Sequence, residues 1–252
     1  MRFSLFRRQP DPAGIEVRHG GVIYRVALRR RDGARRMTLR VSQATGDVTL
    51  TLPRHVDLDS AATFADAHGG WIAARLARRP NAVPFRPGAE VPLRGVPHRI
   101  VHWSQTRGLT RATRDAEGRP IIAVAGETAH VARRVRDYLR QAALDDLGEA
   151  VARHTRTLGI PAKKLTIRDT TSRWGSCSSV GHLSFSWRLI LAPPAVLDYL
   201  AAHEVAHLKE MNHSSRFWAV TRRLCPHTDE AESWLKRHGA SLHAYGCDIT
   251  GS

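Results

Sequence analysis

The 252-residue chain has little cysteine, little lysine and no long apolar run. Its three cysteines, Cys177, Cys225 and Cys247, cannot all pair with one another and form no C-x-x-C knuckle, so a disulfide framework is not expected. No apolar stretch approaches the roughly 18 residues of a transmembrane helix, which predicts no membrane span. Residues 1–8 hold too few apolar side chains for a secretion signal. We therefore expect a cytoplasmic protein.

Positive charge is in excess. The chain has 39 basic and 23 acidic residues, a net charge of +16, and only four of the basic residues are Lys. Such a surplus can indicate contact with nucleic acid or another polyanion. However, a GC-rich coding sequence would give the same preference for Arg, and the basic residues are spread rather than clustered with aromatics. Nucleic-acid contact is therefore kept as the weaker hypothesis.

The most informative motif is H-E-V-A-H at residues 203–207, followed six residues later by His213. Histidines four apart share one face of a helix, so the imidazoles of His203 and His207 can reach one metal ion. Glu204 is placed to take a proton from a metal-activated water. His213 would be a third ligand, leaving the fourth position of zinc open as in catalytic sites. We therefore predict that His203, His207 and His213 bind Zn²⁺, with Glu204 as catalytic base.

The flanking residues predict a buried helix that carries this motif. Pro193–Pro194 is typical of a helix start, and apolar residues follow at helical spacing. Asn212 can take the left-handed conformation that ends a helix, so we expect the helix to reach residues 211–212. Glu210 stands where the metzincin pattern H-E-x-x-H-x-x-G-x-x-H has its turn-forming Gly, which favours a longer helical path before His213.

The remaining patterns predict an α+β fold. The expected strands fall at residues 15–17, 22–28, 38–41, 48–52, 98–103, 120–125, 165–169 and 182–187. Besides the motif helix and a following helix capped by Ser214 or Ser215, helices are expected at residues 58–79, 129–158 and 229–238. Asp32–Gly33 and Gly46–Asp47 predict turns, the first of them in a hairpin.

These elements group into four segments. Residues 1–14 form a loose basic arm, and residues 15–128 form a β-rich accessory region with one helix. Residues 129–245 form the catalytic domain, with a small sheet and the motif helix in the order of a zincin, and residues 246–252 are a tail. Whether the accessory region folds independently or packs onto the catalytic domain stays open.

Further runs near the motif resemble a known family. They read R-W-G-S-C at 173–177, L-S-F-S-W-R-L at 183–189, N-H-S at 212–214 and F-W at 217–218. With the H-E-x-x-H helix, these runs resemble the YgjP-like zinc metallopeptidases, which are related to SprT-like and WLM-type proteases. The resemblance is tight over about residues 129–245. It implies a zincin-like fold, the same zinc ligands and base, and hydrolysis of peptide bonds in a peptide or protein substrate.

In zincins an extended substrate usually lies along a sheet edge beside the metal helix. The strand Leu183–Trp187 is the candidate edge here. Trp174 and the Gly175–Ser176 loop are expected at the entrance of the substrate groove beside it. Core packing is the simpler interpretation of Trp174 and Trp187, and a tight turn is the simpler one of Gly175.

Assisting residues are less defined by spacing. Partners for the second ring nitrogen of the metal-bound histidines could come from acidic residues that would equally suit a helix N-terminus, namely Asp229, Glu230 and Glu232. Three residues could stabilise an oxyanion, and spacing does not choose between them: Tyr245, Arg173 and His243.

Alternatives remain. The chain could be a non-proteolytic module that binds nucleic acid or a partner and keeps a structural or vestigial metal site. However, a metal site without catalytic activity does not need Glu204. A zinc hydrolase of non-peptide amides would keep the same residues. Cys177 and Cys225 as zinc ligands are disfavoured, because the histidines already complete a site.

Overall fold

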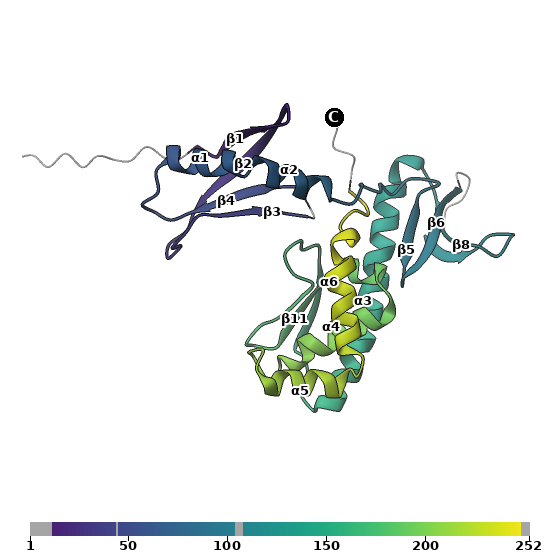
Figure 1. The fold of residues 1–252 in the computed structure, drawn as a ribbon. Coiled ribbons are helices and arrows are strands. Elements are labelled where there is room, and N and C mark those ends of the chain that lie inside the picture. Colours follow the sequence, from purple (N-terminus) through teal and green to yellow (C-terminus); the bar gives the residue numbers. More distant parts are fainter. Residues whose placement is uncertain (1–11, 44, 104–107, 248–252) are drawn as a thin grey trace, which may run out of the picture. The chain divides into compact units, whose positions relative to one another are not determined.

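A computed structural model describes residues 12–43, 45–103 and 108–247. The chain divides into two compact units, Met1–Arg79 and Pro80–Ser252, called here the first and second units (Figure 1). Most of the expected basic arm and tail lies outside the described residues. No helix in the described ranges is long and apolar enough to cross a membrane.

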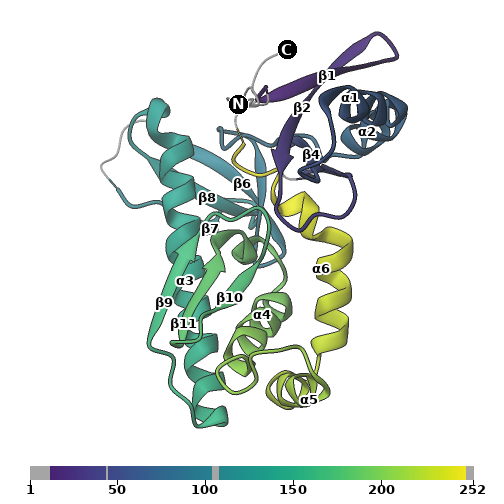
Figure 2. The same ribbon diagram turned by 90° about the vertical axis from the view of Figure 1, so that its left-hand side faces the viewer.

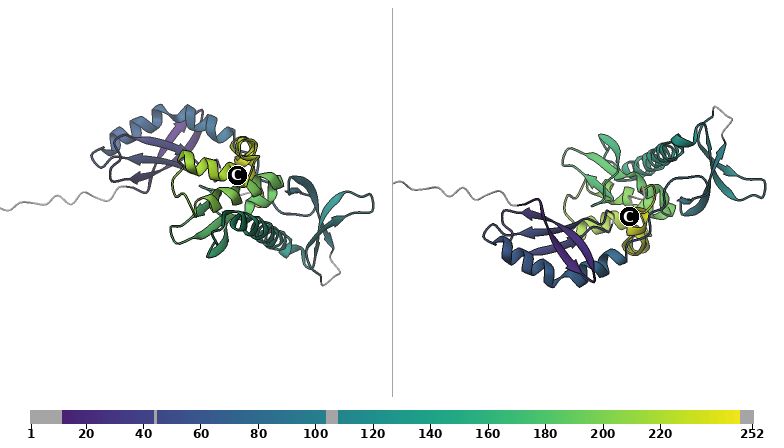
Figure 3. Two further views of the ribbon diagram at one scale, coloured as in Figure 1. Left: turned by 90° about the horizontal axis from the view of Figure 1, so that it is seen from below. Right: turned by 90° about the horizontal axis from the view of Figure 1, so that it is seen from above.

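The first unit is a four-stranded sheet with two helices on one face (Figure 3). Its elements are β1 (Gly14–His19), β2 (Val22–Arg30), β3 (Thr38–Val41), β4 (Val48–Leu52), α1 (Leu58–Ala67) and α2 (Gly69–Ala77). The strand order is β1-β2-β4-β3, with β2 parallel to β4 and the other pairs antiparallel. Apolar side chains from the sheet and helices, including Val17, Leu50 and Ile72, form its core.

Two local predictions for this unit are wrong. The segment at Asp32–Gly33 joins no hairpin, because β3 pairs with β4 rather than with β2. The β1–β2 hairpin turns at Gly20–Gly21, where both residues have positive φ, and the β3–β4 hairpin turns at the predicted Gly46–Asp47. The helix expected over 58–79 is broken at His68. A Cβ on Gly69 would lie 3.0 Å from the Cβ of His19, so the glycine lets α2 approach β1 closely.

The second unit places two small sheets around a long helix (Figure 1). Its strands are β5 (Glu90–Leu93), β6 (Val96–Trp103), β7 (Arg111–Arg114), β8 (Pro120–Ala125), β9 (Lys164–Arg168), β10 (Gly175–Cys177) and β11 (His182–Ser186). Its α-helices are α3 (Val131–Leu158), α4 (Pro194–Ala206), α5 (Ser215–Leu224) and α6 (Thr228–Leu242). One sheet has the order β5-β6-β8-β7 and the other β10-β11-β9. Helix α4 lies between α3 and α6 (Figure 2).

One hydrophobic core runs through the second unit. It joins Val91 and Ile122 of the first sheet to Leu139 of α3 and Leu200 of α4. Trp187, fully buried, lies in the same core, as the packing interpretation expects. The unit therefore begins at Pro80, whereas the sequence places a boundary between residues 128 and 129, because strands β5 to β8 share their core with α3 and α4.

Helix α3 is the element on which this core depends. It ends as predicted at Gly159, which takes the left-handed conformation (φ 77°) and donates its N–H to the Thr155 carbonyl. We expect Leu139→Ala, at a fully buried position, to lower the free energy of unfolding by about 2–5 kcal/mol through the cavity that it leaves. Leu144→Ala, on the exposed side of the same helix, should change it by about 0.5 kcal/mol. Urea denaturation measures both, and equal losses would contradict the assignment.

Candidate metal centre

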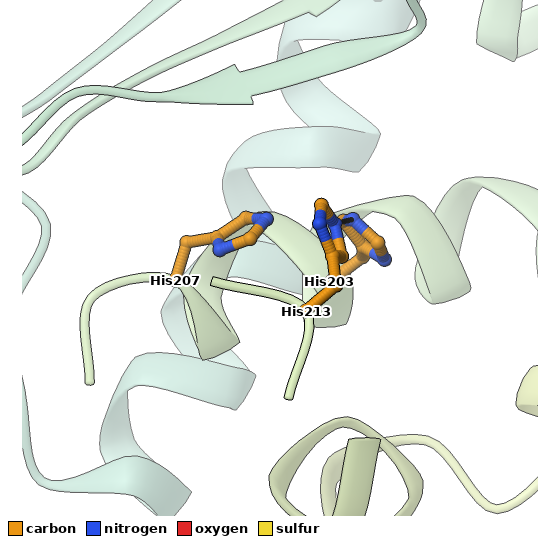
Figure 4. A group of neighbouring side chains, drawn as sticks. All are labelled: His203, His207 and His213. Atoms are coloured by element: carbon orange, nitrogen blue, oxygen red, sulfur yellow. Dashed lines mark hydrogen bonds between the residues drawn. The ribbon is translucent and has the colours of Figure 1, made fainter. Parts of the chain in front are cut away.

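Helix α4 and the loop after it bring three histidines together. His203 lies on the last turn of α4, His207 caps its C-terminus, and His213 lies in the loop before α5 (Figure 4). One ring nitrogen from each lies within 4.8 Å of the others. The Nε2 atoms of His203 and His213 are 3.1 Å apart. The three histidines that the sequence spacing selects therefore lie close together in the structure.

The loop reaches this geometry because α4 ends early. The helix stops at Ala206, so the expectation that it continues to residues 211–212 is wrong. Its last turn tightens to three-residue spacing, with Leu208 N–H donating to the Val205 carbonyl and Lys209 N–H to the Ala206 carbonyl. The chain then turns back toward the histidines.

Helix α5 holds the loop from the other side. The predicted cap is present: Ser214 Oγ accepts a hydrogen bond from Phe217 N–H at 3.3 Å. The fully buried Phe217 ring stacks on His207, with centroids 4.4 Å apart and planes inclined by 29°. Trp218 lies beside His203 and His213, at centroid distances of 5.8 and 6.0 Å. These rings restrict the rotamers of all three imidazoles.

Two histidines have a partner for their second ring nitrogen. His207 Nδ1 donates to the Glu210 carbonyl at 3.0 Å, which leaves its Nε2 as the lone-pair nitrogen of a neutral ring. His203 Nδ1 lies 3.5 Å from the Tyr199 hydroxyl. The sequence interpretation missed both partners, although Tyr199, four residues before His203, shares its helix face.

The acidic residues suggested for this role are engaged elsewhere or exposed. Asp229 pairs with Arg222 at 3.0 Å, and Glu232 pairs with Lys236 at 2.8 Å. Glu230 is exposed in the first turn of α6. Their position suits the helix N-terminus better than the histidines.

The electrostatics favour neutral imidazoles. Burial, together with the neighbouring His207 and His213, lowers the pKa of His203 to about 4. Burial also lowers the pKa of His207. Zinc binds the neutral form of histidine, so His203 and His207 can bind it at pH 7 without first losing a proton. Three converging imidazoles are a donor set that fits zinc.

Glu204 follows His203 on the last turn of α4 and is 4% exposed. Burial raises the pKa of its carboxyl to about 8, while the charge of Arg173 opposes this rise. A Cβ on Gly175 would lie 2.7 Å from Glu204 Cγ, too close to fit without movement. Gly175 is therefore required by the close approach of β10 to Glu204, and the tight-turn interpretation is wrong.

The sheet edge beside α4 is not the one predicted. Strand β11 is central, pairing with β10 on one side and β9 on the other, so the expectation that Leu183–Trp187 forms the edge is wrong. The edge strand beside α4 is β10, although the sequence predicts a loop at these residues. A hollow of about 670 Å³ lies along this sheet, and its lining includes Lys164, Arg168 and Arg173.

Of the three oxyanion candidates, Arg173 acts on the site through its charge. His243 stacks on Trp174 with ring centroids 4.8 Å apart. The carbonyl of Tyr245 accepts a hydrogen bond from Arg188 at 2.7 Å. The last two contacts hold the C-terminal end of α6 against the core.

Comparison with known proteins gives the family of the chain. Residues 35–238 match the family model of the YgjP-like metallopeptidase domain. The chain belongs to the YgjP-like family. A search of solved structures gives the crystal structure of the metallopeptidase zymogen of Pyrococcus abyssi abylysin, at 22% identity and a TM-score of 0.34. That match covers 38% of this chain and 94% of the other. The search of curated proteins returned no match.

The metallopeptidase assignment implies a bound metal, and the YgjP-like histidine cluster predicts where it binds. We expect His213→Ala to lose about one equivalent of zinc relative to the wild type, because a site with two imidazoles binds far more weakly. Elemental analysis of protein purified without chelators measures this. His182→Ala, which removes an exposed imidazole from β11, is the control and should keep the wild-type content. Equal zinc in both variants would refute the three-histidine site.

Proposed function

We propose that this chain is a zinc-dependent metallopeptidase of zincin-like fold, which hydrolyses peptide bonds with Glu204 as general base and His203, His207 and His213 as zinc ligands. The observation that carries the proposal is a buried carboxyl group on the last turn of α4, which also carries the first of three converging imidazoles. A purely structural site would gain nothing from a buried carboxylate that binds no metal.

The metal and the Glu204 carboxylate would have different roles in the reaction. When bound, zinc supplies the Lewis acidity that acidifies water and polarises a peptide carbonyl. Glu204 accepts the proton of the attacking water and returns it to the leaving amine. Burial makes Glu204 a stronger base than an exposed carboxylate, and a bound dication would draw its pKa back down toward neutrality.

The second unit supplies a place for the substrate backbone. Strand β10 is the sheet edge beside Glu204, so an extended peptide paired with it would pass the base. Gly175 keeps that edge free of a side chain at its nearest point to the carboxylate. Hydrolysis of a non-peptide amide would use the same groups, and a panel of peptide and non-peptide amides separates the two functions.

The location of the protein is also a proposal. Cys177, Cys225 and Cys247 are all unpaired, which suits the reducing cytoplasm.

Removing the base tests the mechanism directly. We expect Glu204→Gln to lower the rate of casein or quenched-peptide cleavage by about 10²–10⁴-fold, because the amide cannot accept the proton. Its zinc content should stay that of the wild type, since Glu204 is not a ligand. Glu230→Gln, a neutralised exposed carboxylate on α6, should cleave at the wild-type rate. Undiminished cleavage by Glu204→Gln would refute the role of Glu204.

The approach of β10 to Glu204 gives an independent prediction. Gly175→Ala should lower cleavage by about 10–100-fold, because the added methyl group must displace either the carboxylate or the strand. Gly148→Ala is the matched control in α3, where a Cβ meets nothing within 4 Å. It should keep full activity and raise the free energy of unfolding by about 0.5–1 kcal/mol. Full activity of Gly175→Ala would show that the carboxylate position is not critical.

A further inference from the structure

A second set of metal-binding side chains lies elsewhere on α4. Asp198 comes from its second turn, and Cys225 and His227 come from the connection between α5 and α6. One carboxylate oxygen, the sulfur and one ring nitrogen all lie within 4.8 Å of one another. None of these residues belongs to the three-histidine centre.

Some polar atoms of this cluster have hydrogen-bond partners and others do not. Asp198 Oδ1 accepts hydrogen bonds from His154 Nε2 at 2.8 Å and Arg153 Nη2 at 3.0 Å. Asp198 Oδ2 instead faces His227 Nε2 at 3.6 Å, which is too long for a hydrogen bond. That nitrogen is buried and has no hydrogen-bond partner in the described part of the chain. A buried nitrogen without a partner costs roughly 1–3 kcal/mol, so the cluster as built lacks one interaction.

The arrangement of Asp198 is that of a ligating carboxylate. In metal sites the oxygen that does not bind the ion is commonly held by donors behind it, which fix the carboxylate plane. His154 and Arg153 do this for Oδ1, and His154 is itself buried. Oδ2 is on the side of His227, 3.6 Å from its Nε2, and one carboxylate oxygen lies within 4.8 Å of both that ring and Cys225 Sγ.

The charges of the three groups also fit a dication. Bound Cys225 would be a thiolate, so together with the Asp198 carboxylate it would neutralise a charge of +2 around a neutral imidazole. Cys225 is fully buried, where a thiolate is stable only beside a cation such as the proposed ion.

We propose that Asp198, Cys225 and His227 form a second metal site, which binds Zn²⁺ or a similar first-row dication. Sulfur and imidazole ligands exclude Mg²⁺ and Ca²⁺, which take oxygen ligands. A hollow of about 460 Å³ is lined in part by Asp198, His227 and Arg94, so two of the three proposed ligands border a space that an ion could enter. The site is independent of the proposed peptidase function.

A metal here would act as a structural clip. It would tie α4, which carries Glu204 and His203, to the end of α5, which carries Phe217 against His207. The ion would thus hold the two helices that shape the candidate metal centre. Its binding energy would add to the stability of the folded chain.

Cobalt titration of the metal-stripped full-length chain tests the proposal. Co²⁺ bound by a thiolate gives a charge-transfer band in the near ultraviolet, whereas a site of three imidazoles gives none. We expect the band in the wild type and in the double variant His203→Ala/His213→Ala. Cys225→Ser should abolish it, and His227→Gln should raise the cobalt concentration for half-saturation at least about tenfold.

The other two cysteines are the matched controls. Cys177→Ser and Cys247→Ser should keep the band with unchanged midpoint. Because Cys225 is fully buried, circular dichroism must show that Cys225→Ser is folded, and His227→Gln, at a partly exposed position, gives a second reading. Absence of the band from the wild type at saturating cobalt would overturn the proposal. So would its persistence in Cys225→Ser, or its loss in Cys177→Ser or in the double histidine variant. A chain without peptidase activity would still show the band, so the two proposals fail separately.

Discussion

The burial of α4 on almost every side is the constraint on which the second unit depends. Its backbone runs between α3 and α6 and passes β10, so its polar side chains have little access to water. A polar group in that position must find a partner on a neighbouring element or destabilise the fold. Glu204 meets this demand poorly, which is why its pKa is raised. Such an unfavourable placement is typical of a functional group.

The same constraint explains the positions of the other polar residues of the helix. His203 and His207 reach the end of α4, where the following loop supplies His213 and the Glu210 carbonyl. Asp198, one helical turn from the start, reaches His154 on α3. The helix is therefore anchored by polar contacts toward both ends, while its middle turns pack with apolar neighbours. Displacing α4 along its axis would disturb both sets of contacts together.

The sequence predicts the local parts of this arrangement well and the non-local parts poorly. The pairing of His203 with His207 on one helix face, the Pro194 start of α4 and the Ser214 cap all depend on residues within one or two turns of each other. Strand β10 does not: residues 175–177 are short and polar, and they form a strand because they pair with residues 183–185 of β11. For the same reason Gly175 seemed a turn residue, since its neighbour Glu204 lies far away in sequence. The unit boundary at Pro80 likewise follows from a core shared between distant segments.

The early end of α4 shows how a local detail decides whether the site can form. Had the helix continued past His207, His213 would lie about 15 Å along the axis from His203, at a rise of about 1.5 Å per residue. The Nε2 atoms of His203 and His213 are instead 3.1 Å apart. The tightened turn after Ala206 and the Ser214 cap together reverse the chain within residues 208–213. A glycine at position 210 is therefore not needed to reach a three-histidine geometry. The reversal uses backbone hydrogen bonds at Val205 and Ala206, which any residue can provide.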